Sequence, residues 1–311
     1  MYPNRLIKRL LYLIFVMWGI SLGTFALLNL IPGDPAEVIL RERHETPSSQ
    51  QIAALRDQMG LNDPWPIRYL HWLSKVFKND WGVSWRTGRP VWQEITSRLE
   101  ATIELALSAF ILIIVISTVF GVLSAFFQNR LLDHMIRGIT VFLSAIPSYW
   151  LGLLLLYFLS YKAQIFPVAG RGRLSHVILP AATLALAIAV LQGRVLRASL
   201  IQIMAMDYIR FALAKGFTFG QIFIYHMLRN ALPPMVTIWA VSLGQLLGGA
   251  IIVETLFAWP GLGQLTLEAV ASRDIPLIQA IVLLLALFFV SINQLAEYLH
   301  RRLDPKVGNT Q

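Results

Sequence analysis

Two glutamates carry the chemistry that the apolar part of this sequence could perform. Glu104 and Glu254 lie within or at the edge of long uncharged runs. A charged group deep in lipid is costly, so such residues are expected to face protein or water and to contact a substrate. Both also lie near the predicted outer ends of their runs, where a side chain reaches the membrane surface at little cost. Substrate contact and plain surface placement are therefore both open for these two residues.

Histidines and nucleophile motifs offer no further catalytic arrangement. The six histidines are spread along the chain, and none has a partner at i+3 or i+4 that would place two metal ligands on one helix face. The patterns G-x-x-x-x-G-K-[ST], G-x-S-x-G and H-E-x-x-H do not occur. With no cysteine, disulfides and thiolate metal sites are impossible. The sequence therefore predicts that the chain is not an enzyme and holds no metal or cofactor of its own.

The elements that must position the two glutamates are apolar helices. Hydrophobic residues make up 56% of the 311 residues and charged residues only 14%, which is typical of membrane proteins. Crossing a hydrocarbon core takes about 20 helical residues. Six runs have about this length or more, and they are Leu10–Ile31, Ala101–Phe127, Ile139–Tyr161, Val177–Gly193, Leu232–Val253 and Pro276–Ala296. They predict an all-α membrane protein with six transmembrane helices, of which the first is retained and not cleaved as a signal peptide.

The distribution of charge predicts the orientation. The pieces that we place in the cytoplasm hold 13 Lys and Arg residues, whereas the two short outer loops hold four. This is the positive-inside bias, and it puts both termini in the cytoplasm. The long outer segment carries nine basic and nine acidic residues. Membrane insertion thus accounts for the net charge of +9, and a nucleic-acid partner is not expected.

The runs divide the chain into four predicted parts. These are a cytoplasmic N-terminus with the first helix at 1–31, an extracytoplasmic segment at 32–100, a core at 101–300 with a cytoplasmic loop at 196–231, and a cytoplasmic tail at 301–311. Within the outer segment, Ser48–Gly60 is predicted to be a surface helix. The tryptophans of this segment predict a position at the membrane interface, with a stacking platform for a ligand as the alternative.

Proline interrupts the third run. Pro147 lies inside it and is followed by Tyr149 and Trp150. A proline in a membrane helix removes a hydrogen bond and kinks the axis, which is tolerated where neighbours or a water-filled cavity satisfy the backbone. The kink predicts either a helix that lines a transport path or a packing requirement alone. Two G-x-x-x-G pairs, Gly19 with Gly23 in the first run and Gly244 with Gly248 in the fifth, predict close helix contacts.

One polar and basic segment in the fourth inter-run piece is unsuited to a bilayer. Residues 207–215 contain good helix formers with an acid at the start, and Gly216 ends the predicted helix. Ile209, Ala212 and Leu213 fall at i, i+3 and i+4, which makes a narrow apolar stripe. The stripe predicts that the helix lies in a groove on another protein. An ordinary amphipathic helix between two spans is the alternative.

The spacing of this segment resembles the cytoplasmic signature of bacterial ABC-importer permeases, which reads E-A-A, three residues, G, nine residues, I-x-L-P. Phe211 replaces the Glu of that pattern, and Ala231-Leu232-Pro233 closes it without the Ile. This degenerate form is typical of the dipeptide, oligopeptide and nickel class. The resemblance implies that the loop docks on an ATPase subunit through Asp207, Arg210, Ala212, Leu213, Ala214, Lys215 and Gly216.

Further matches extend the resemblance over nearly the whole chain. They include Gly33-Asp34-Pro35, Gly60–Pro64, Arg86–Val91 and Arg273-Asp274-Ile275-Pro276. Another match contains Trp259, Pro260, Gly261 and Gly263. Its Pro-Gly-Leu-Gly sequence forces a turn, which predicts a re-entrant or interfacial element at the outer mouth.

The resemblance implies a type I ABC-importer permease fold in the inner membrane. It also implies three kinds of protein partner beside lipid: a homologous second permease, two ATP-binding subunits that hold ATP and Mg²⁺, and an extracytoplasmic substrate-binding protein. Pro147, Tyr149, Trp150, Glu104 and Glu254 are the candidates for the translocation path.

The substrate is predicted from two short segments. Residues 145–150 and 257–265 resemble metal and metal-opine permeases, so the predicted cargo is nickel or a metal-chelator complex. A dipeptide or oligopeptide is the alternative within the same family. A membrane-embedded enzyme and a stand-alone channel are alternatives of other classes, although no paired catalytic residues support the first and a channel would not need the cytoplasmic helix.

Overall fold

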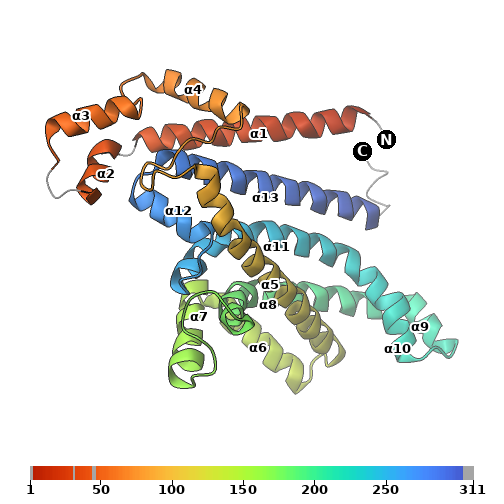
Figure 1. Ribbon diagram of the computed structural model, residues 1–311. Helices are drawn as coiled ribbons and strands as arrows, with labels where there is room; N and C mark the ends of the chain where they lie inside the picture. Colours follow the sequence, from red (N-terminus) through yellow and green to blue (C-terminus); the bar gives the residue numbers. More distant parts are fainter. Residues whose placement is uncertain (1–2, 31, 44–46, 304–311) are drawn as a thin grey trace. The chain divides into compact units, whose positions relative to one another are not determined.

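Long helices make up most of the computed structural model, which describes residues 3–30, 32–43 and 47–303 (Figure 1). The long helices are α1 (Pro3–Leu30), α5 (Val91–Phe126), α8 (Leu174–Met204), α11 (Arg229–Leu256) and α13 (Ile275–Leu303). Each belongs to a segment long and apolar enough to cross a membrane. The described residues contain no β-strand, only an isolated bridge between Val83 and Pro90. The all-α prediction is confirmed, and residues 304–311 of the predicted tail lie outside the described part.

The third predicted span is not one continuous helix. α6 (Leu131–Ala145) ends before Pro147, and α7 (Ser148–Leu155) begins after it and continues into the π-helical η1 (Leu156–Lys162). The two parts meet at an angle of 108°, so the predicted kink is a full break. Proline causes this because its ring excludes the helical hydrogen bond and favours extended backbone at the preceding residue, and Ile146 has a ψ of 128°. With this bent pair counted as one span, the structure has the six predicted spans.

Three short helices follow α1, namely α2 (Pro35–Arg43), α3 (Ser49–Gln58) and α4 (Trp65–Phe77). The hydroxyl of Ser48 accepts from the backbone N–H of Gln51, and the Gln51 side chain accepts from the backbone N–H of Ser48. This reciprocal pair is a capping box, which satisfies two helix-end donors. The surface helix predicted near Ser48 is therefore present as α3.

The chain forms two compact units, which we describe separately. The first comprises residues 1–100 and 260–290, and the second comprises residues 101–259 and 291–311. α5 begins at Val91, before the predicted start of its apolar run at Ala101, because no proline or glycine follows Pro90 until well inside the run. The four-part division of the sequence stays a prediction.

In the first unit, α12 (Leu262–Ala271) and the start of α13 pack on the first turns of α5. The buried side chains of this core are Val91, Ile95, Leu262, Leu265, Ala269, Leu277, Ile278, Ala280 and Ile281. α1 is held to α4 by Tyr69, whose hydroxyl lies 2.8 Å from the Ser21 hydroxyl and whose ring lies edge-on to Phe25 at 5.3 Å. The last third of α1 therefore supports α4.

In the second unit, α8 packs against α6, α7 and α11. α5 and α8 approach closely at two glycines, because a Cβ on Gly121 would lie only 2.9 Å from the carbonyl oxygen of Gly193. The G-x-x-x-G glycines behave differently. A Cβ on Gly248 would have open space around it, and Gly19 and Gly23 meet nothing in the first unit. The prediction of close helix contacts is therefore wrong for Gly19, Gly23 and Gly248 within their own units, whereas at Gly244, which is buried, it stays a prediction.

Candidate functional site

The predicted loop helix is present as α9 (Asp207–Ala214). Asp207 lies in the first turn, where its negative charge interacts favourably with the positive end of the helix dipole. At the other end Gly216 has a left-handed φ of +85°. The N–H of Gly216 donates to the Leu213 carbonyl at 3.0 Å, and the N–H of Phe217 donates to the Ala212 carbonyl at 3.3 Å. These two bonds form a Schellman motif, in which the left-handed residue is usually glycine.

Two of the three residues in the apolar stripe face the core of the protein itself. Ile209 and Ala212 are 4% and 5% exposed and belong to the apolar core of the second unit, whereas Leu213 is 52% exposed. α10 (Phe219–Ile222) and η2 (Phe223–Leu228) contribute to the same core and leave no room for a partner on that side. The prediction that the whole stripe docks on another protein is therefore wrong for Ile209 and Ala212.

The remaining surface of α9 is open to a partner. We call it the α9 exposed surface, and it consists of Asp207, Arg210, Phe211, Leu213, Ala214 and Lys215. The Lys215 ammonium lies 4.6 Å from the Phe211 ring centroid, and Arg210 lies 4.0 Å from Asp207. Contacts between such exposed groups stabilise a fold little. The surface mixes charge with an aromatic and an aliphatic side chain, as protein interfaces do.

The loop that carries α9 is tied to two long helices. The Asn230 amide of α11 donates to the Tyr208 hydroxyl of α9 at 3.2 Å. Phe219 and Phe223 lie edge-on to Phe126 at the end of α5, with ring centroids 5.0 and 5.2 Å apart. The loop is therefore in direct contact with both α5 and α11.

A buried ion pair, which the sequence did not predict, holds α6 to α8. Arg197 donates from Nε and Nη2 to the two carboxylate oxygens of Asp133 at 2.9 and 2.8 Å. The Ser124 hydroxyl and the Asn129 backbone N–H also donate to Asp133, which is fully buried. The available signal was a lone acid, Asp133, in a short basic piece between two apolar runs.

Glu254 is fully buried and does not reach a surface. The Thr102 hydroxyl donates to its carboxylate at 2.8 Å. The chain then folds back over this position, because the Trp259 backbone N–H donates to the Glu254 carbonyl at 2.7 Å and the Trp259 indole donates to the Ala101 carbonyl at 2.8 Å. The predicted surface placement of Glu254 is wrong, and its contact with a substrate stays a prediction.

The other candidates for the translocation path include side chains that are more exposed than that buried carboxylate. Glu104 is partly exposed and paired with Arg171 at 2.7 Å, so its charge is already compensated. Pro147 precedes the first turn of α7, and this turn carries Tyr149 and Trp150, which are about half exposed. Such a surface is open to a path, a partner subunit or lipid, and the path assignment stays a prediction.

The predicted turn of Trp-Pro-Gly-Leu-Gly is present. Trp259 has no exposed surface and packs in the core of the second unit. In the first unit, Pro260 and Gly261 lead into α12, where Gly261 is the N-cap and Gly263 is buried. The position of this turn at an outer mouth stays a prediction.

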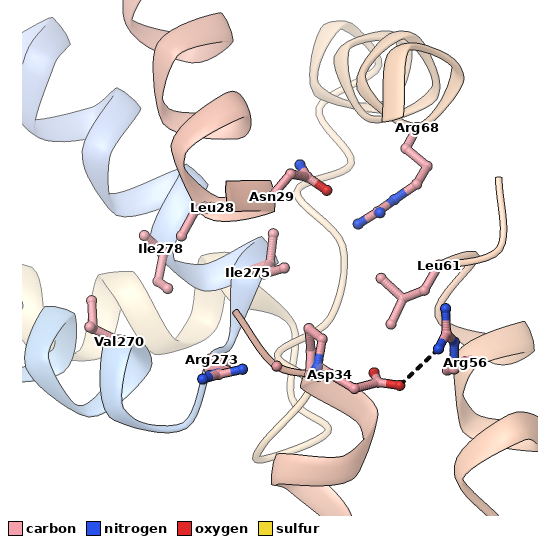
Figure 2. Close-up of a pocket in the computed structure, with 12 residues that line it drawn as sticks. Leu28, Asn29, Asp34, Arg56, Leu61, Arg68, Val270, Arg273, Ile275 and Ile278 are labelled. Carbon is pink, nitrogen blue, oxygen red and sulfur yellow. Dashed lines mark hydrogen bonds and ion pairs between the residues drawn. The ribbon is translucent and has the colours of Figure 1, made fainter. Parts of the chain in front are cut away.

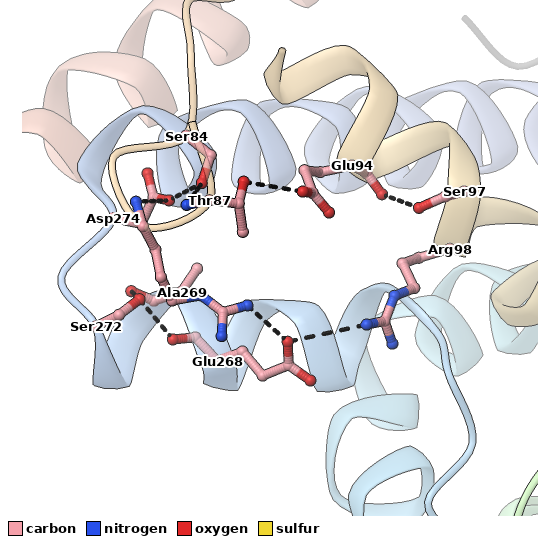
Figure 3. Close-up of polar contacts among 10 residues, drawn as sticks. Ser84, Thr87, Glu94, Ser97, Arg98, Glu268, Ala269, Ser272 and Asp274 are labelled. Atoms are coloured by element: carbon pink, nitrogen blue, oxygen red, sulfur yellow. Dashed lines mark hydrogen bonds and ion pairs between the residues drawn. The ribbon is translucent and has the colours of Figure 1, made fainter. Parts of the chain in front are cut away.

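A polar network that the sequence did not predict joins α12 to the segment before α5 (Figure 3). Arg86 donates to the Glu268 carboxylate at 3.0 Å, and Arg98 lies 3.9 Å from the same oxygen. Asp274 is fully buried and accepts hydrogen bonds from the Ser84 hydroxyl and from the backbone N–H of Arg86 at 3.3 Å. The sequence analysis noted Arg86–Val91 and Arg273–Pro276 as separate motifs, but nothing in the sequence indicated that they are in contact.

Metal-ligating residues do not gather in the described part of the chain. Within residues 3–30, 32–43 and 47–303, no three His, Asp or Glu side chains are close enough together to hold a metal ion.

Family models match almost the full length of the chain. Residues 117–309 match the binding-protein-dependent transport system inner membrane component, and residues 3–106 match the N-terminal region of such membrane components. A probable peptide ABC transporter permease protein, y4tP of Sinorhizobium fredii, is 33% identical over 310 residues, covering 97% of this chain and 98% of the relative. The glutathione transport system permease protein GsiC of Escherichia coli K12 is 36% identical over 304 residues, covering 98% of each chain.

A solved structure shows the same fold. A chain of the inward-facing MetNI methionine ABC transporter aligns with a TM-score of 0.60 and 19% sequence identity, covering 69% of this chain and 98% of that chain. The type I permease fold predicted from the sequence is thereby confirmed. The chain belongs to the inner membrane components of binding-protein-dependent transport systems, and it is a permease subunit of an ABC importer and not itself an enzyme.

Proposed function

We propose that this permease subunit carries short peptides across the inner membrane. The supporting observation is that two relatives matched over 97% and 98% of this chain are named as permeases for peptide and for glutathione, which is itself a tripeptide. The nickel prediction rested on two short segments, and these comparisons give it no support. Peptide import therefore becomes the main proposal.

The chain would supply the path and leave energy and selection to partners. The proposed complex contains a homologous second permease, two ATP-binding subunits that bind ATP and Mg²⁺, and a substrate-binding protein on the outer side. Both termini and α9 would lie in the cytoplasm, in line with the distribution of Lys and Arg. ATP hydrolysis would then take place next to the α9 exposed surface.

α9 is suited to pass movement from the ATP-binding subunits to the spans. It is a short helix of eight residues with a fixed C-terminal turn, and its inner face is packed in the core. Closure of the ATP-binding subunits would displace α9 as a rigid lever, and the contacts of Tyr208 and Phe126 would tilt α11 and α5. Coupling is reciprocal, so loaded binding protein on the outer side should favour closure of the ATP-binding subunits.

Uptake by the reconstituted complex tests the substrate. Vesicles that contain both permeases and the ATP-binding subunits are given binding protein with labelled glutathione, trialanine, nickel ion or chelated nickel. We expect ATP-dependent uptake of at least one tripeptide and no nickel uptake above the level without ATP. Uptake of nickel or its chelate alone would overturn the peptide proposal and restore the metal prediction.

Two controls separate the importer from other classes. Co-purification of the ATP-binding subunits with this chain is expected for an importer. Cargo that crosses vesicles containing this chain alone, without nucleotide, would instead indicate a stand-alone channel.

A further inference from the structure

A pocket of about 340 Å³ lies in the first unit, where α1 ends and α13 begins (Figure 2). This volume is within the range of small-ligand sites, which is roughly 300–1,000 Å³. Leu28 of α1 and Ile275 and Ile278 of α13 form an apolar wall. Both helices belong to predicted membrane spans, so the pocket opens where two spans reach the membrane surface.

The charged side chains that line the pocket are three arginines and one aspartate, and only one of the arginines forms an ion pair. Asp34 pairs with Arg56 at 3.1 Å, and its other oxygen accepts from the Ala36 backbone N–H at 3.0 Å. Arg68 and Arg273 form no ion pair with any described residue. Figure 2 shows their guanidinium groups approaching the pocket from two different elements. Within the described residues these two cations therefore lack an ion-pair partner, although Asp63 is close enough to Arg68 to act on its charge.

Arg273 is held in place but lacks an acceptor. Its Nη1 atom is buried and has no hydrogen-bond partner in the described part of the chain. Buried donors without an acceptor are rare in folded proteins. Gly33 makes room for this side chain, because a methyl group on Gly33 would overlap the guanidinium. The backbone of Arg273 also has a left-handed φ of +53°, a conformation that few residues other than glycine adopt.

Arg68 is placed above an aromatic ring on the other side. Its guanidinium carbon lies 5.9 Å from the centroid of the Phe25 ring. Burial lowers the pKa of Arg68, while the nearby Asp63 raises it and the charge of Arg56 lowers it again. The positive charge of Arg56 therefore acts on Arg68, and an anion that interacts with both guanidinium groups is favoured here.

The helix that carries Arg68 has the features of an interfacial helix. α4 buries Tyr69 against α1 and exposes Trp65, Ile67, Leu70 and Phe77. An amphipathic helix with exposed aromatic and aliphatic side chains lies in the headgroup region of a membrane. An interfacial α4 would place the pocket beside it at the depth of the lipid phosphates.

We propose that this pocket binds a phosphate group, supplied by the headgroup of an anionic phospholipid. Planar guanidinium groups match the oxygens of a phosphate, so Arg68 and Arg273 would each donate to them. The apolar wall of Leu28, Ile275 and Ile278 would contact the lipid next to its headgroup. A bound lipid would join α1, α4 and the start of α13 at the membrane surface.

Lipid titration of the purified importer complex tests this site. The delipidated complex in detergent is titrated with phosphatidylglycerol, phosphatidylcholine or inorganic phosphate, and bound molecules are counted by native mass spectrometry. We expect phosphatidylglycerol to bind most tightly. Arg68→Gln and Arg273→Gln should each weaken it about tenfold, as expected for the loss of one charge-assisted contact.

Two further variants separate charge from position. Arg41→Gln removes an exposed arginine of the same unit, outside the pocket, and should bind phosphatidylglycerol as the wild type does. Gly33→Ala keeps every charge but displaces the Arg273 guanidinium, so it should weaken binding about as much as Arg273→Gln does. Thermal unfolding without lipid checks that each variant is folded.

Each remaining outcome decides for or against the site. Inorganic phosphate that binds as well as the lipid, with the same sensitivity to Arg68→Gln, would support the phosphate site and assign its ligand to solution. Unchanged lipid binding in both arginine variants would overturn the proposal. If those variants instead lost stimulation of ATP hydrolysis by the binding protein, the arginines would belong to a protein-docking surface. Peptide uptake tests a separate claim and can fail independently.

Discussion

Two polar regions of this apolar chain differ in how far their charged groups are paired. They are the network around Glu268 and Asp274 and the α9 exposed surface. In the first, carboxylates accept from arginine, serine and backbone donors within the same unit. In the second, Asp207 and Arg210 are exposed and are only weakly paired, at 4.0 Å. Buried polar groups without partners are costly, whereas exposed ones are free to bind.

The difference distinguishes residues that hold the fold from residues that are available to a partner. Both regions contain acids, arginines and small residues at spacings that match the same family. Only the first uses these groups to join segments far apart in the sequence. Substitutions in the first should therefore change stability, and substitutions in the second should change coupling.

The largest effect is expected for Asp274→Ala. It removes the acceptor for the Ser84 hydroxyl and the Arg86 N–H in a fully buried position, so the free energy of unfolding should fall by about 3 kcal/mol. Thermal unfolding in detergent, followed by circular dichroism, measures this change. Glu37→Ala is the control, because its pair with Arg41 is exposed and should matter by less than about 0.5 kcal/mol. Equal effects of the two substitutions would refute the assigned role.

A smaller effect is expected for Ala212→Leu. The side chain is buried, so the added volume should destabilise the second unit by about 2 kcal/mol. The same change at Ala214, which is exposed on the same helix, should leave stability unchanged and instead reduce ATP-driven transport. If Ala214→Leu were the more destabilising variant, the assignment of inner and outer faces would be reversed.

Gly216→Val tests the end of the lever. A β-branched residue with a φ of +85° should cost about 1.5 kcal/mol and loosen the turn after α9, so ATP hydrolysis should continue while uptake falls. Gly220→Ala is the matched control, since Gly220 has no positive φ and an added Cβ meets nothing within 4 Å. Normal uptake by Gly216→Val would count against a rigid lever.

The smallest effect on stability is expected for Leu213→Ala, and it sharpens the contrast most. Leu213 is half exposed, so the free energy of unfolding should change by less than about 0.5 kcal/mol. If Leu213 contacts an ATP-binding subunit, transport-coupled ATP hydrolysis should fall by about tenfold. Leu174→Ala, at an exposed leucine that begins α8 in the same unit, should leave both quantities unchanged. If Leu213→Ala and Leu174→Ala had the same effect on ATP hydrolysis, Leu213 would not belong to the docking surface.

Much of this protein was predictable because the signals are local. Hydropathy over about 20 residues predicted five spans and the region of the bent sixth. The ends of α9 and α3 were marked by residues within one turn, namely Asp207 with Gly216 and Ser48. Motif spacing alone predicted the permease family, and the comparisons confirmed it.

The sequence by itself determined that this is a membrane protein of the ABC-importer permease class, that a proline lies inside its third span, and that its loop helix ends at Gly216. Only the tertiary structure decided that Ile209 and Ala212 face inward, that Glu254 is sealed beside Thr102, and that Asp274 holds Ser84. The reason is distance along the chain. Thr102 and Glu254 are 152 residues apart, and Ser84 and Asp274 are 190 apart. Periodicity and caps act over a few residues, whereas such pairs exist only after the helices have packed.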